Sequence, residues 1–350
     1  MGCGRIAQQV HLNILRRLPN VELVALAEID PQQRDKAVAV ALGAVAFDSY
    51  EKMLELPQLE AVVICLPNAL HADAAIAALE RGKHVYLEKP LATNVADGQR
   101  VLEAWRRSGL IGMIGFNYRF QRLYQRLKQQ IQAGRLGELV GVSSVFSTAG
   151  RELPDWKLTR ENGGGVLLDL ASHHIDLISY LLEQPVSEVF AYIQSKRSEE
   201  DTAALQLRLA SGLAVQCFFS LSAAEEDRFE LYGTAGKLTA DRYLSSDLEI
   251  SDPARNLARV KKFGHSMRSL IHSPYLLERF HKDTCDPSFN SALAYFVESV
   301  RLGRPAQPDF LDGLRSLTVI EAAEKSARAA CAVSIAEFAR EEEKQNARAG

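Results

Sequence analysis

The chain has 350 residues, of which 47% are hydrophobic and 24% charged, and its formal net charge is −3 at pH 7. These values are ordinary for a globular protein large enough for two domains, and they exclude a broad electrostatic attraction for nucleic acid or an anionic membrane. No apolar run approaches the ~20 residues of a membrane span, and neither a signal-peptide pattern nor a metal or disulfide spacing of the five cysteines is present. We expect a cytoplasmic protein that binds no metal, nucleic acid or membrane.

The chain begins with a glycine pattern. Gly2, Gly4 and Ala7 form G-x-G-x-x-A ahead of an amphipathic run that predicts a helix over residues 5–18. This pattern is typical of the turn that brings a helix N-terminus to the pyrophosphate of a dinucleotide. A predicted strand over 22–27 ends in Glu28, about where an acidic residue binds ribose hydroxyls and repels a 2′-phosphate. The spacing therefore favours NAD over NADP, although a solvated charge at a strand end would look the same.

The glycine pattern has no strand before it, because only Met1 precedes Gly2. A dinucleotide-binding fold needs a hydrophobic strand of roughly five or six residues at this point, in the centre of its sheet. We expect that the sequence begins at an internal methionine or that the natural product is truncated. The native gene would then encode a short strand rich in Val and Ile ahead of Gly2.

The rest of the first third alternates between helices and strands, which indicates a doubly wound parallel sheet with ligands at the carboxyl ends of its strands. The predicted helices cover 32–42, 49–56, 69–81 and 96–108, and the predicted strands cover 44–47, 61–66, 84–87 and 111–116. The strand at 84–87 runs into Glu88-Lys89-Pro90, which places Lys89 at the ligand-binding edge. The alternative for Lys89 is a solvated lysine.

Beyond residue 120 consecutive strands with short turns follow, which indicate an α+β unit on an open, mainly antiparallel sheet. The predicted strands cover 138–147, 186–194, 203–209, 213–221 and two runs flanking the turn at 233–236, and the predicted helices cover 122–132, 291–302 and 311–332. We divide the chain into a dinucleotide-binding domain (1–119), a second domain (120–340) and a tail (341–350) that is expected to fray.

Three glycines at 163–165 lead into a largely apolar segment that predicts a buried helix. Asp169, His173 and Asp176 stand at i, i+4 and i+7 of this helix and so share one stripe, whereas His174 lies about 100° away and is assigned a structural role. Buried carboxylates and imidazoles are costly unless paired, and such pairs occur where a protein needs a proton acceptor. The alternative is a structural Asp–His pair on a solvated face.

Together these residues resemble the Gfo/Idh/MocA family of NAD(P)-dependent oxidoreductases, the relatives of glucose–fructose oxidoreductase and inositol dehydrogenase. The marks are Glu88-Lys89-Pro90, Leu66-Pro67-Asn68 with His71, the three glycines, and the stripe from Asp169 to Asp176. The resemblance implies that Lys89, Asp169 and His173 are catalytic and, with Trp156, bind the substrate. His173 would accept the proton of an alcohol, Lys89 would stabilise alkoxide charge, and Asp169 would orient the imidazole or bind a second hydroxyl.

The resemblance also implies a set of cofactor contacts. These are Gly2, Gly4, Arg5, Ile6, Glu28, Leu66, Pro67, Asn68, His71, Glu88, Lys89 and Asn117. His71 could instead be a helix N-terminal residue without a ligand. Lys157 departs from the family, whose members often carry arginine there, because lysine cannot form a bidentate clamp.

The implied function is hydride transfer between NAD(P) and a hydroxyl carbon of a polyol, sugar or sugar derivative. Two alternatives remain: a non-catalytic NAD(P)-binding regulatory protein of the same fold, and an NAD-dependent glycosidase. We expect a homodimer or homotetramer that pairs through the open face of the second sheet. Val215, Cys217 and Phe219 share one face of this sheet by alternation.

Overall fold

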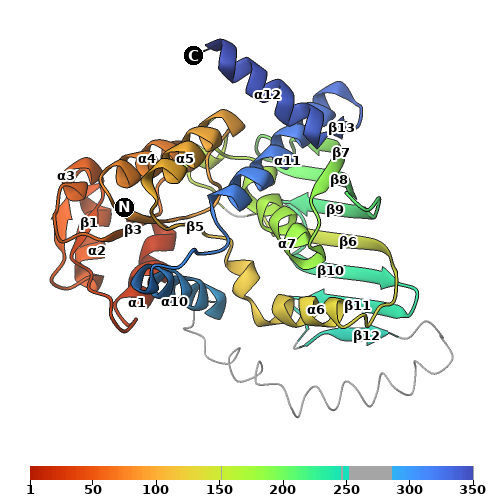
Figure 1. Ribbon diagram of the computed structural model, residues 1–350, viewed down its shortest axis with the longest axis horizontal. Coiled ribbons are helices and arrows are strands. Elements are labelled where there is room, and N and C mark those ends of the chain that lie inside the picture. Colours follow the sequence, from red (N-terminus) through yellow and green to blue (C-terminus); the bar gives the residue numbers. More distant parts are fainter. Residues whose placement is uncertain (151, 246, 252–285, 350) are drawn as a thin grey trace.

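The computed structural model describes all residues except 151, 246, 252–285 and 350. The described residues form two lobes side by side, one around short parallel strands and the other around an eight-stranded sheet (Figure 1). Helices α7 (Ser172–Leu182) and α11 (Phe310–Ala329) lie between the two lobes. The structure thereby confirms the predicted combination of a Rossmann-like unit and a second unit with a large open sheet.

The N-terminal lobe has the predicted alternation, with shorter strands than expected. Its elements are a π-helical turn Ala7–His11, α1 (Leu12–Leu15), β1 (Ala25–Ala27), α2 (Pro31–Val40), β2 (Val45–Phe47), α3 (Tyr50–Leu54), β3 (Ala61–Ile64), α4 (His71–Glu80), β4 (His84–Leu87), α5 (Val95–Ser108) and β5 (Gly112–Ile114). Side-chain caps fix several helix starts: Asp30 accepts from Gln32 N, and Asn94 accepts from Asp97 N. The first helix ends at Leu15 rather than at residue 18.

Among the described residues, the parallel strands of this lobe form two separate sheets, because β1 pairs only with β2 while β3, β4 and β5 pair in that order. Met1 and Gly2 lie between the sheets and bond to both. The Met1 ammonium donates to Val63 O at 2.8 Å, Cys65 N donates to Met1 O at 2.8 Å, and Gly2 N donates to Ala27 O at 2.9 Å. These two residues occupy the carboxyl end of the central strand position, as the fold requires of the residues that lead into the glycine turn.

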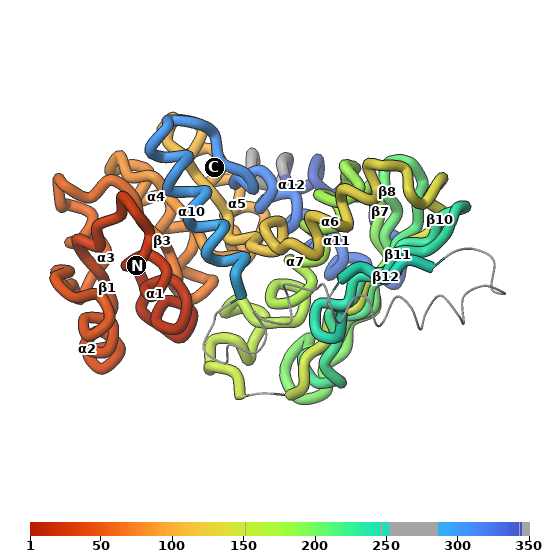
Figure 2. The backbone as a smooth tube through the Cα atoms, turned by 90° about the horizontal axis from the view of Figure 1, so that it is seen from below, coloured from red at the N-terminus to blue at the C-terminus, as the bar shows by residue number. Residues whose placement is uncertain are grey.

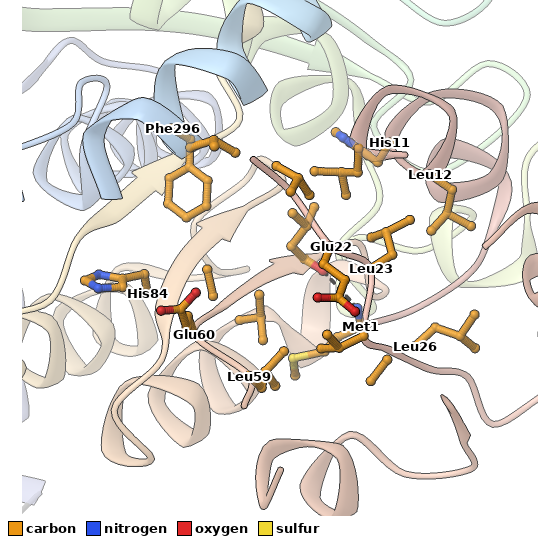
Figure 3. A pocket seen from close by; sticks show the side chains of 18 of the residues that line it. Met1, His11, Leu12, Glu22, Leu23, Leu26, Leu59, Glu60, His84 and Phe296 are labelled. Atoms are coloured by element: carbon orange, nitrogen blue, oxygen red, sulfur yellow. Dashed lines mark hydrogen bonds between the residues drawn. The ribbon is translucent and has the colours of Figure 1, made fainter. Parts of the chain in front are cut away.

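A cavity of about 860 Å³ lies next to Met1 between the two sheets (Figure 3). Most residues of its wall are apolar, among them Leu23 and Leu26 from β1 and the segment before it, and Phe296 from helix α10 (Pro287–Leu302). Glu60 and His84 also line it. Within the described part of the chain, no other strand joins β1 to β3.

The second lobe contains a mixed sheet in the order β12-β11-β10-β6-β9-β8-β7-β13. Its strands are β6 (Leu139–Ser147), β7 (Val186–Gln194), β8 (Thr202–Leu209), β9 (Ala214–Ser220), β10 (Glu226–Gly233), β11 (Gly236–Asp241), β12 (Glu249–Ser251) and β13 (Val333–Ser334), and α6 spans Arg122–Gln132. Within the part of the sheet that the structure describes, only β6 and β9 pair in parallel and the other pairs are antiparallel, which confirms the mainly antiparallel sheet.

One face of this sheet is covered and the other is open. Val215, Cys217 and Phe219 do share a face, but each is at most 5% exposed, so the prediction that they lie on the open face is wrong. Strand alternation tells which residues share a face, while the helices packed against the sheet decide which face is buried. The large apolar side chains exposed on the strands of this sheet are Val140, Phe190, Tyr192, Phe218, Tyr232 and Ile250.

The C-terminal part of the chain does not stay with the second lobe. Helix α10 packs Leu293 and Phe296 into one apolar cluster with Tyr86 of β4 and Met113 of β5 (Figure 2). Helix α12 continues over Ile335–Ala349, through the segment predicted to fray. Among the described residues, no helix is long and apolar enough to cross a membrane.

Candidate active site

The lobes meet where the turn after β4 faces the helix predicted to be buried. Lys89 Nζ donates to Asp169 O at 2.6 Å and lies 3.3 Å from Asp169 Oδ1, and Lys157 Nζ lies 2.7 Å from the same Oδ1. The three side chains are mostly buried, being 10–21% exposed. Burial lowers the pKa of Lys89; the Asp169 carboxylate offsets part of this change, and the neighbouring Lys157 adds to it. Two ammonium groups thus share one carboxylate at this point.

His173 lies in the same cluster, on the aromatic ring of Tyr118. The two ring centroids are 4.6 Å apart with an interplanar angle of 19°. The imidazole is partly exposed, but its Nδ1 is buried and has no hydrogen-bond partner among the described residues. Burial lowers the pKa of His173 well below its usual range, and the Lys89 ammonium acts in the same direction. The ring is therefore neutral near pH 7, a state in which one of its nitrogens can accept a proton.

The predicted stripe of Asp169, His173 and Asp176 is interrupted. A π-helical turn spans Leu167–Ala171 before α7 begins, and its wider spacing changes the angular register between Asp169 and His173. Asp169 accordingly bonds to lysines, and Asp176 bonds to Arg119, which the sequence reading did not single out. Arg119 also lies 3.2 Å from Asp312. His174 is fully buried between Ser144 and Asp227, which confirms its structural role.

The three-glycine turn fits tightly against two other motifs. Gly163 has φ +92°, its O accepts from Asn68 Nδ2 at 2.7 Å, and a Cβ on it would lie 2.6 Å from the Asn68 Cβ. A Cβ on Gly164 would lie 2.3 Å from Lys157 O. Glycine is thus required here for the backbone to approach the Leu66-Pro67-Asn68 segment and the turn that carries Trp156 and Lys157. Trp156 lies beneath the Lys157 ammonium, which is 5.2 Å from its ring centroid.

The glycine turn at the start of the chain has the shape of a pyrophosphate cradle. Gly2 has φ +78° and a Cβ on it would lie 2.7 Å from Cys65 O, whereas nothing lies within 4 Å of a Cβ on Gly4. Arg5 and Ile6 follow at the open helix N-terminus, where main-chain N–H groups attract anions. Glu28 accepts from Cys3 N at 2.6 Å and from Asp30 N at 3.0 Å, so its carboxylate is fixed beside the turn.

One cation near Glu28 was missed in the sequence. Arg34 donates through Nη1 to Glu28 O at 2.8 Å and to Ile29 O at 3.4 Å. The sequence could have indicated this contact. Arg34 stands one helical turn beyond the Asp30 N-cap of α2, so its side chain returns to the end of β1. An arginine at this edge is the residue type that accommodates a 2′-phosphate.

The remaining predicted cofactor residues fall into two groups. Asn117 is buried and donates to Ser288 Oγ at 2.8 Å, while its Oδ1 has no partner in the described part of the chain. His71 and Glu88 are engaged within the protein instead. The two ring nitrogens of His71 lie 2.6 and 2.9 Å from the carbonyl oxygens of Pro90 and Leu66, and Glu88 lies 2.7 Å from His11 Nε2. An open glycine, a helix N-terminus and an unpaired amide oxygen fit a bound dinucleotide.

No group of three or more metal-ligating side chains occurs among the described residues. The four cysteines within these residues are free, and Cys285 lies outside them.

Two family models match the chain. Residues 1–116 match the oxidoreductase family with an NAD-binding Rossmann fold, and residues 124–239 match the GFO/IDH/MocA C-terminal domain. Fold and site together define an NAD(H)-binding oxidoreductase. The chain belongs to the Gfo/Idh/MocA family, as its motifs predicted.

Several named relatives and solved structures match most of the chain. Myo-inositol 2-dehydrogenase of Thermotoga maritima is 28% identical over 93% of this chain and 94% of its own. A 1,5-anhydro-D-fructose reductase of Ensifer adhaerens is 31% identical over 68% of this chain and 73% of its own. The WlbA dehydrogenase of Bordetella pertussis, solved with NADH and UDP-GlcNAcA, has a TM-score of 0.79 at 24% identity, with 95% of each chain covered, and so shares the fold.

Proposed function

We propose that this protein is an NAD-dependent dehydrogenase that transfers hydride between the cofactor and a hydroxyl carbon of a polyol, sugar or sugar derivative. The observation that carries the proposal is the meeting of Lys89, Asp169 and His173 at the edge of a dinucleotide-binding sheet. Relatives named for inositol and anhydrofructose support the substrate class. NAD(H), when bound, supplies the hydride acceptor or donor.

Each of the three residues has a separate task. His173, kept neutral by its surroundings, takes the proton of the reacting hydroxyl through Nε2. Lys89, held by Asp169, directs its ammonium at the oxygen on which negative charge develops. Asp169 anchors both Lys89 and Lys157, so we assign it the role of placing these cations.

A substrate panel and one substitution test this function. The full chain is assayed with NAD and a set of polyols and sugars, following the absorbance of the reduced cofactor. On the substrate found, His173→Ala should lower kcat by roughly 10²–10⁴-fold with cofactor binding near normal. A variant that keeps more than half of the wild-type turnover would rule out the base. Hydrolysis without net NADH would instead indicate a glycosidase, and cofactor binding without any turnover a regulatory protein.

We also propose that NAD is preferred over NADP. The Glu28 carboxylate is fixed beside the glycine turn, where it would repel a 2′-phosphate, and the Arg34 Nη1 contacts carbonyl oxygens instead of facing the Glu28 carboxylate. Titration of both cofactors measures the preference. Glu28→Gln should reduce the difference in affinity between NAD and NADP. Equal or tighter NADP binding by the unmodified chain would contradict the assignment of Glu28 to the ribose of NAD.

We propose in addition a homodimer or homotetramer formed through the open sheet face. Phe190 and Tyr192 of β7 and Phe218 of β9 expose 39–61% of their surface there, and only β8 separates these two strands in the described sheet. Light scattering at micromolar concentration should show the oligomer, and Phe218→Arg should dissociate it. The matched control is Leu42→Glu, which changes an exposed apolar residue at the end of α2 in the other lobe. A purely monomeric wild-type chain would overturn this assignment.

A further inference from the structure

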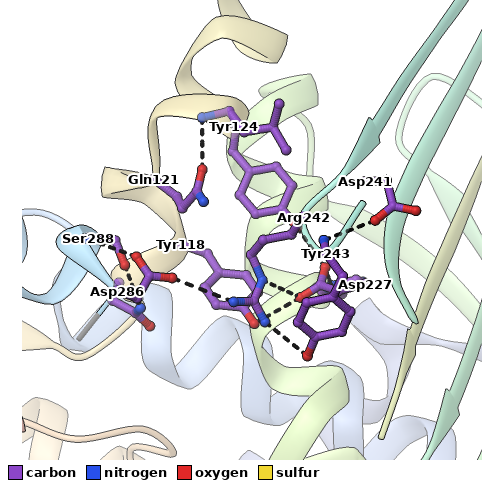
Figure 4. Close-up of polar contacts among 12 residues, drawn as sticks. Tyr118, Gln121, Tyr124, Asp227, Asp241, Arg242, Tyr243, Asp286 and Ser288 are labelled. Atoms are coloured by element: carbon purple, nitrogen blue, oxygen red, sulfur yellow. Dashed lines mark hydrogen bonds and ion pairs between the residues drawn. The ribbon is translucent and has the colours of Figure 1, made fainter. Parts of the chain in front are cut away.

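A buried polar cluster of Tyr118, Tyr124, Asp227 and Arg242 lies against the second sheet (Figure 4). At its centre is Asp227 of β10, whose carboxylate has no exposed surface. It accepts from Tyr124 OH at 2.7 Å, Tyr118 OH at 3.0 Å and Arg242 Nε at 2.7 Å, and it lies 3.2 Å from His174 Nε2. A buried carboxylate with this many partners is rigid, since any movement would break several charge-assisted hydrogen bonds.

Tyr118 connects this cluster to His173. Its hydroxyl is fixed by Asp227, its ring is stacked on the His173 imidazole, and the Arg242 guanidinium carbon lies 4.8 Å from the same ring's centroid. The Tyr118 ring is therefore held at its tip by a hydrogen bond and on its face by a cation. Because His173 Nδ1 has no hydrogen-bond partner among the described residues, the stack is the contact that defines the plane of the imidazole.

We propose that Tyr118 is the positioning residue of His173 and that Arg242, packed on the same ring, holds Tyr118 in place and adds a positive charge near the imidazole. The inference rests on the proposed role of His173 as the base, and it assigns that base a rigid support from the second lobe. In other dehydrogenases and hydrolases a carboxylate that bonds to Nδ1 often orients such a histidine. Here an aromatic face takes that place.

The charges around His173 determine whether loss of Arg242 raises or lowers the pKa of the imidazole. After burial, Lys89, His174 and Arg242 lower the pKa of His173, and Asp169 raises it. These groups come from the turn after β4, from α7, from the segment after β11 and from the π-helical turn. Removal of the Arg242 charge should raise the pKa of His173, an effect to which the remaining Asp227 carboxylate adds. Since alcohol oxidation needs the neutral imidazole, the acid limb of kcat/KM should move to higher pH.

The charge is tested with Arg242→Met, with Arg242→Lys as the charge-conserving variant. Two readouts are taken on the full chain: the pH profile of kcat/KM and the NMR titration of the His173 imidazole. Arg242→Met should move both to higher pH, and Arg242→Lys should leave both near wild type. The matched control is Arg228→Met, on the residue next to Asp227 in β10, whose partners are Glu226 and Glu230.

The stack is tested separately, because loss of Arg242 leaves a buried carboxylate that can prevent folding. Tyr118→Phe keeps the ring and should retain kcat within a few-fold, whereas Tyr118→Leu removes it and should lower kcat by roughly 100-fold with KM for the cofactor unchanged. Wild-type kcat in Tyr118→Leu, or an unmoved titration of His173 in folded Arg242→Met, would overturn the inference. If the His173 titration moves in folded Arg242→Met while the pH profile of kcat/KM stays at its wild-type position, the result supports the effect of Arg242 on His173. It then refutes the proposed role of His173 as the base.

Discussion

The ion pair between the lobes should dominate the stability of the protein, and Arg119→Met tests this. Arg119 of the short helical segment after β5 donates to both oxygens of Asp176 at 2.9 and 2.5 Å and to Asp312 at 3.2 Å. The Asp176 side chain is 2% exposed and the Arg119 side chain 11% exposed. Without Arg119, water cannot replace the lost partner, so a nearly buried carboxylate would be left without its counter-ion.

Breaking a buried pair from one side costs about 3–5 kcal/mol in the free energy of unfolding. The cost depends on pH, because burial raises the pKa of Asp176 to about 6 even with Arg119 opposing it. A carboxyl whose folded pKa lies above its unfolded value of about 4 loses stability as the pH rises through the folded pKa. In the variant this pKa rises further. The loss should therefore increase as the pH rises above about 6 and fall to about 1–2 kcal/mol at about pH 5, where Asp176 is protonated and only hydrogen bonds and packing are lost.

Urea unfolding followed by the fluorescence of Trp105 and Trp156 measures the effect. With a slope of about 3 kcal/mol/M, the midpoint should fall by about 1 M or more at neutral pH. Arg119→Met/Asp176→Asn should recover much of the loss. Arg100→Met is the matched control: Arg100 also pairs with two carboxylates but is 56% exposed, so its removal should cost less than about 1 kcal/mol. An equal loss at both pH values would refute the electrostatic reasoning.

Three further outcomes follow from the cluster, the glycine turn and the second lysine. Although burial opposes it, Arg242 and His174 hold the pKa of Asp227 well below its usual range, so Asp227 stabilises the fold above about pH 4 and loses this effect as the pH falls below it. Asp227→Asn should therefore lower the Tm near pH 7 and flatten the decline of Tm in acid, as calorimetry at several pH values would show; an unchanged acid slope would contradict this. Gly163→Ala should lower kcat/KM at least 10-fold, whereas Gly212→Ala, at the same kind of φ but with open space around it, should cost only about 1 kcal/mol of stability. Lys157→Met should lower kcat/KM while Lys157→Arg retains most of it, and steady-state kinetics that show no difference between the two would exclude a role for this charge.

The sequence was sufficient for features that depend on local periodicity. The alternation of helices and strands and the change to an antiparallel sheet after residue 120 follow from short patterns. The approach of Lys89 to Asp169, 80 positions apart, was expected only from the family resemblance. Strands β12 and β13 were not predicted, because segments of three and two residues carry no detectable period.

Contacts between residues far apart in the sequence could not be predicted from sequence patterns. Arg119 and Asp176 are 57 positions apart, and Tyr118 and Asp227 are 109 apart, so no spacing rule connects them. The stripe predicted for Asp169, His173 and Asp176 assumed a regular α-helix through Asp169. The structure has a π-helical turn there instead, and the sequence pattern did not indicate it. The chemical groups of the site were thus predictable, whereas the groups that hold them in place depend on tertiary packing.

The return of α10 to the N-terminal lobe has a consequence for how the chain folds as it is synthesised. Domains made first on the ribosome commonly fold first, while the rest of the chain is still being translated. Here Tyr86 and Met113 are fully buried in a cluster that also needs Leu293 and Phe296. The nascent N-terminal lobe is therefore expected to expose an apolar face until α10 has left the exit tunnel, and to complete its packing only then.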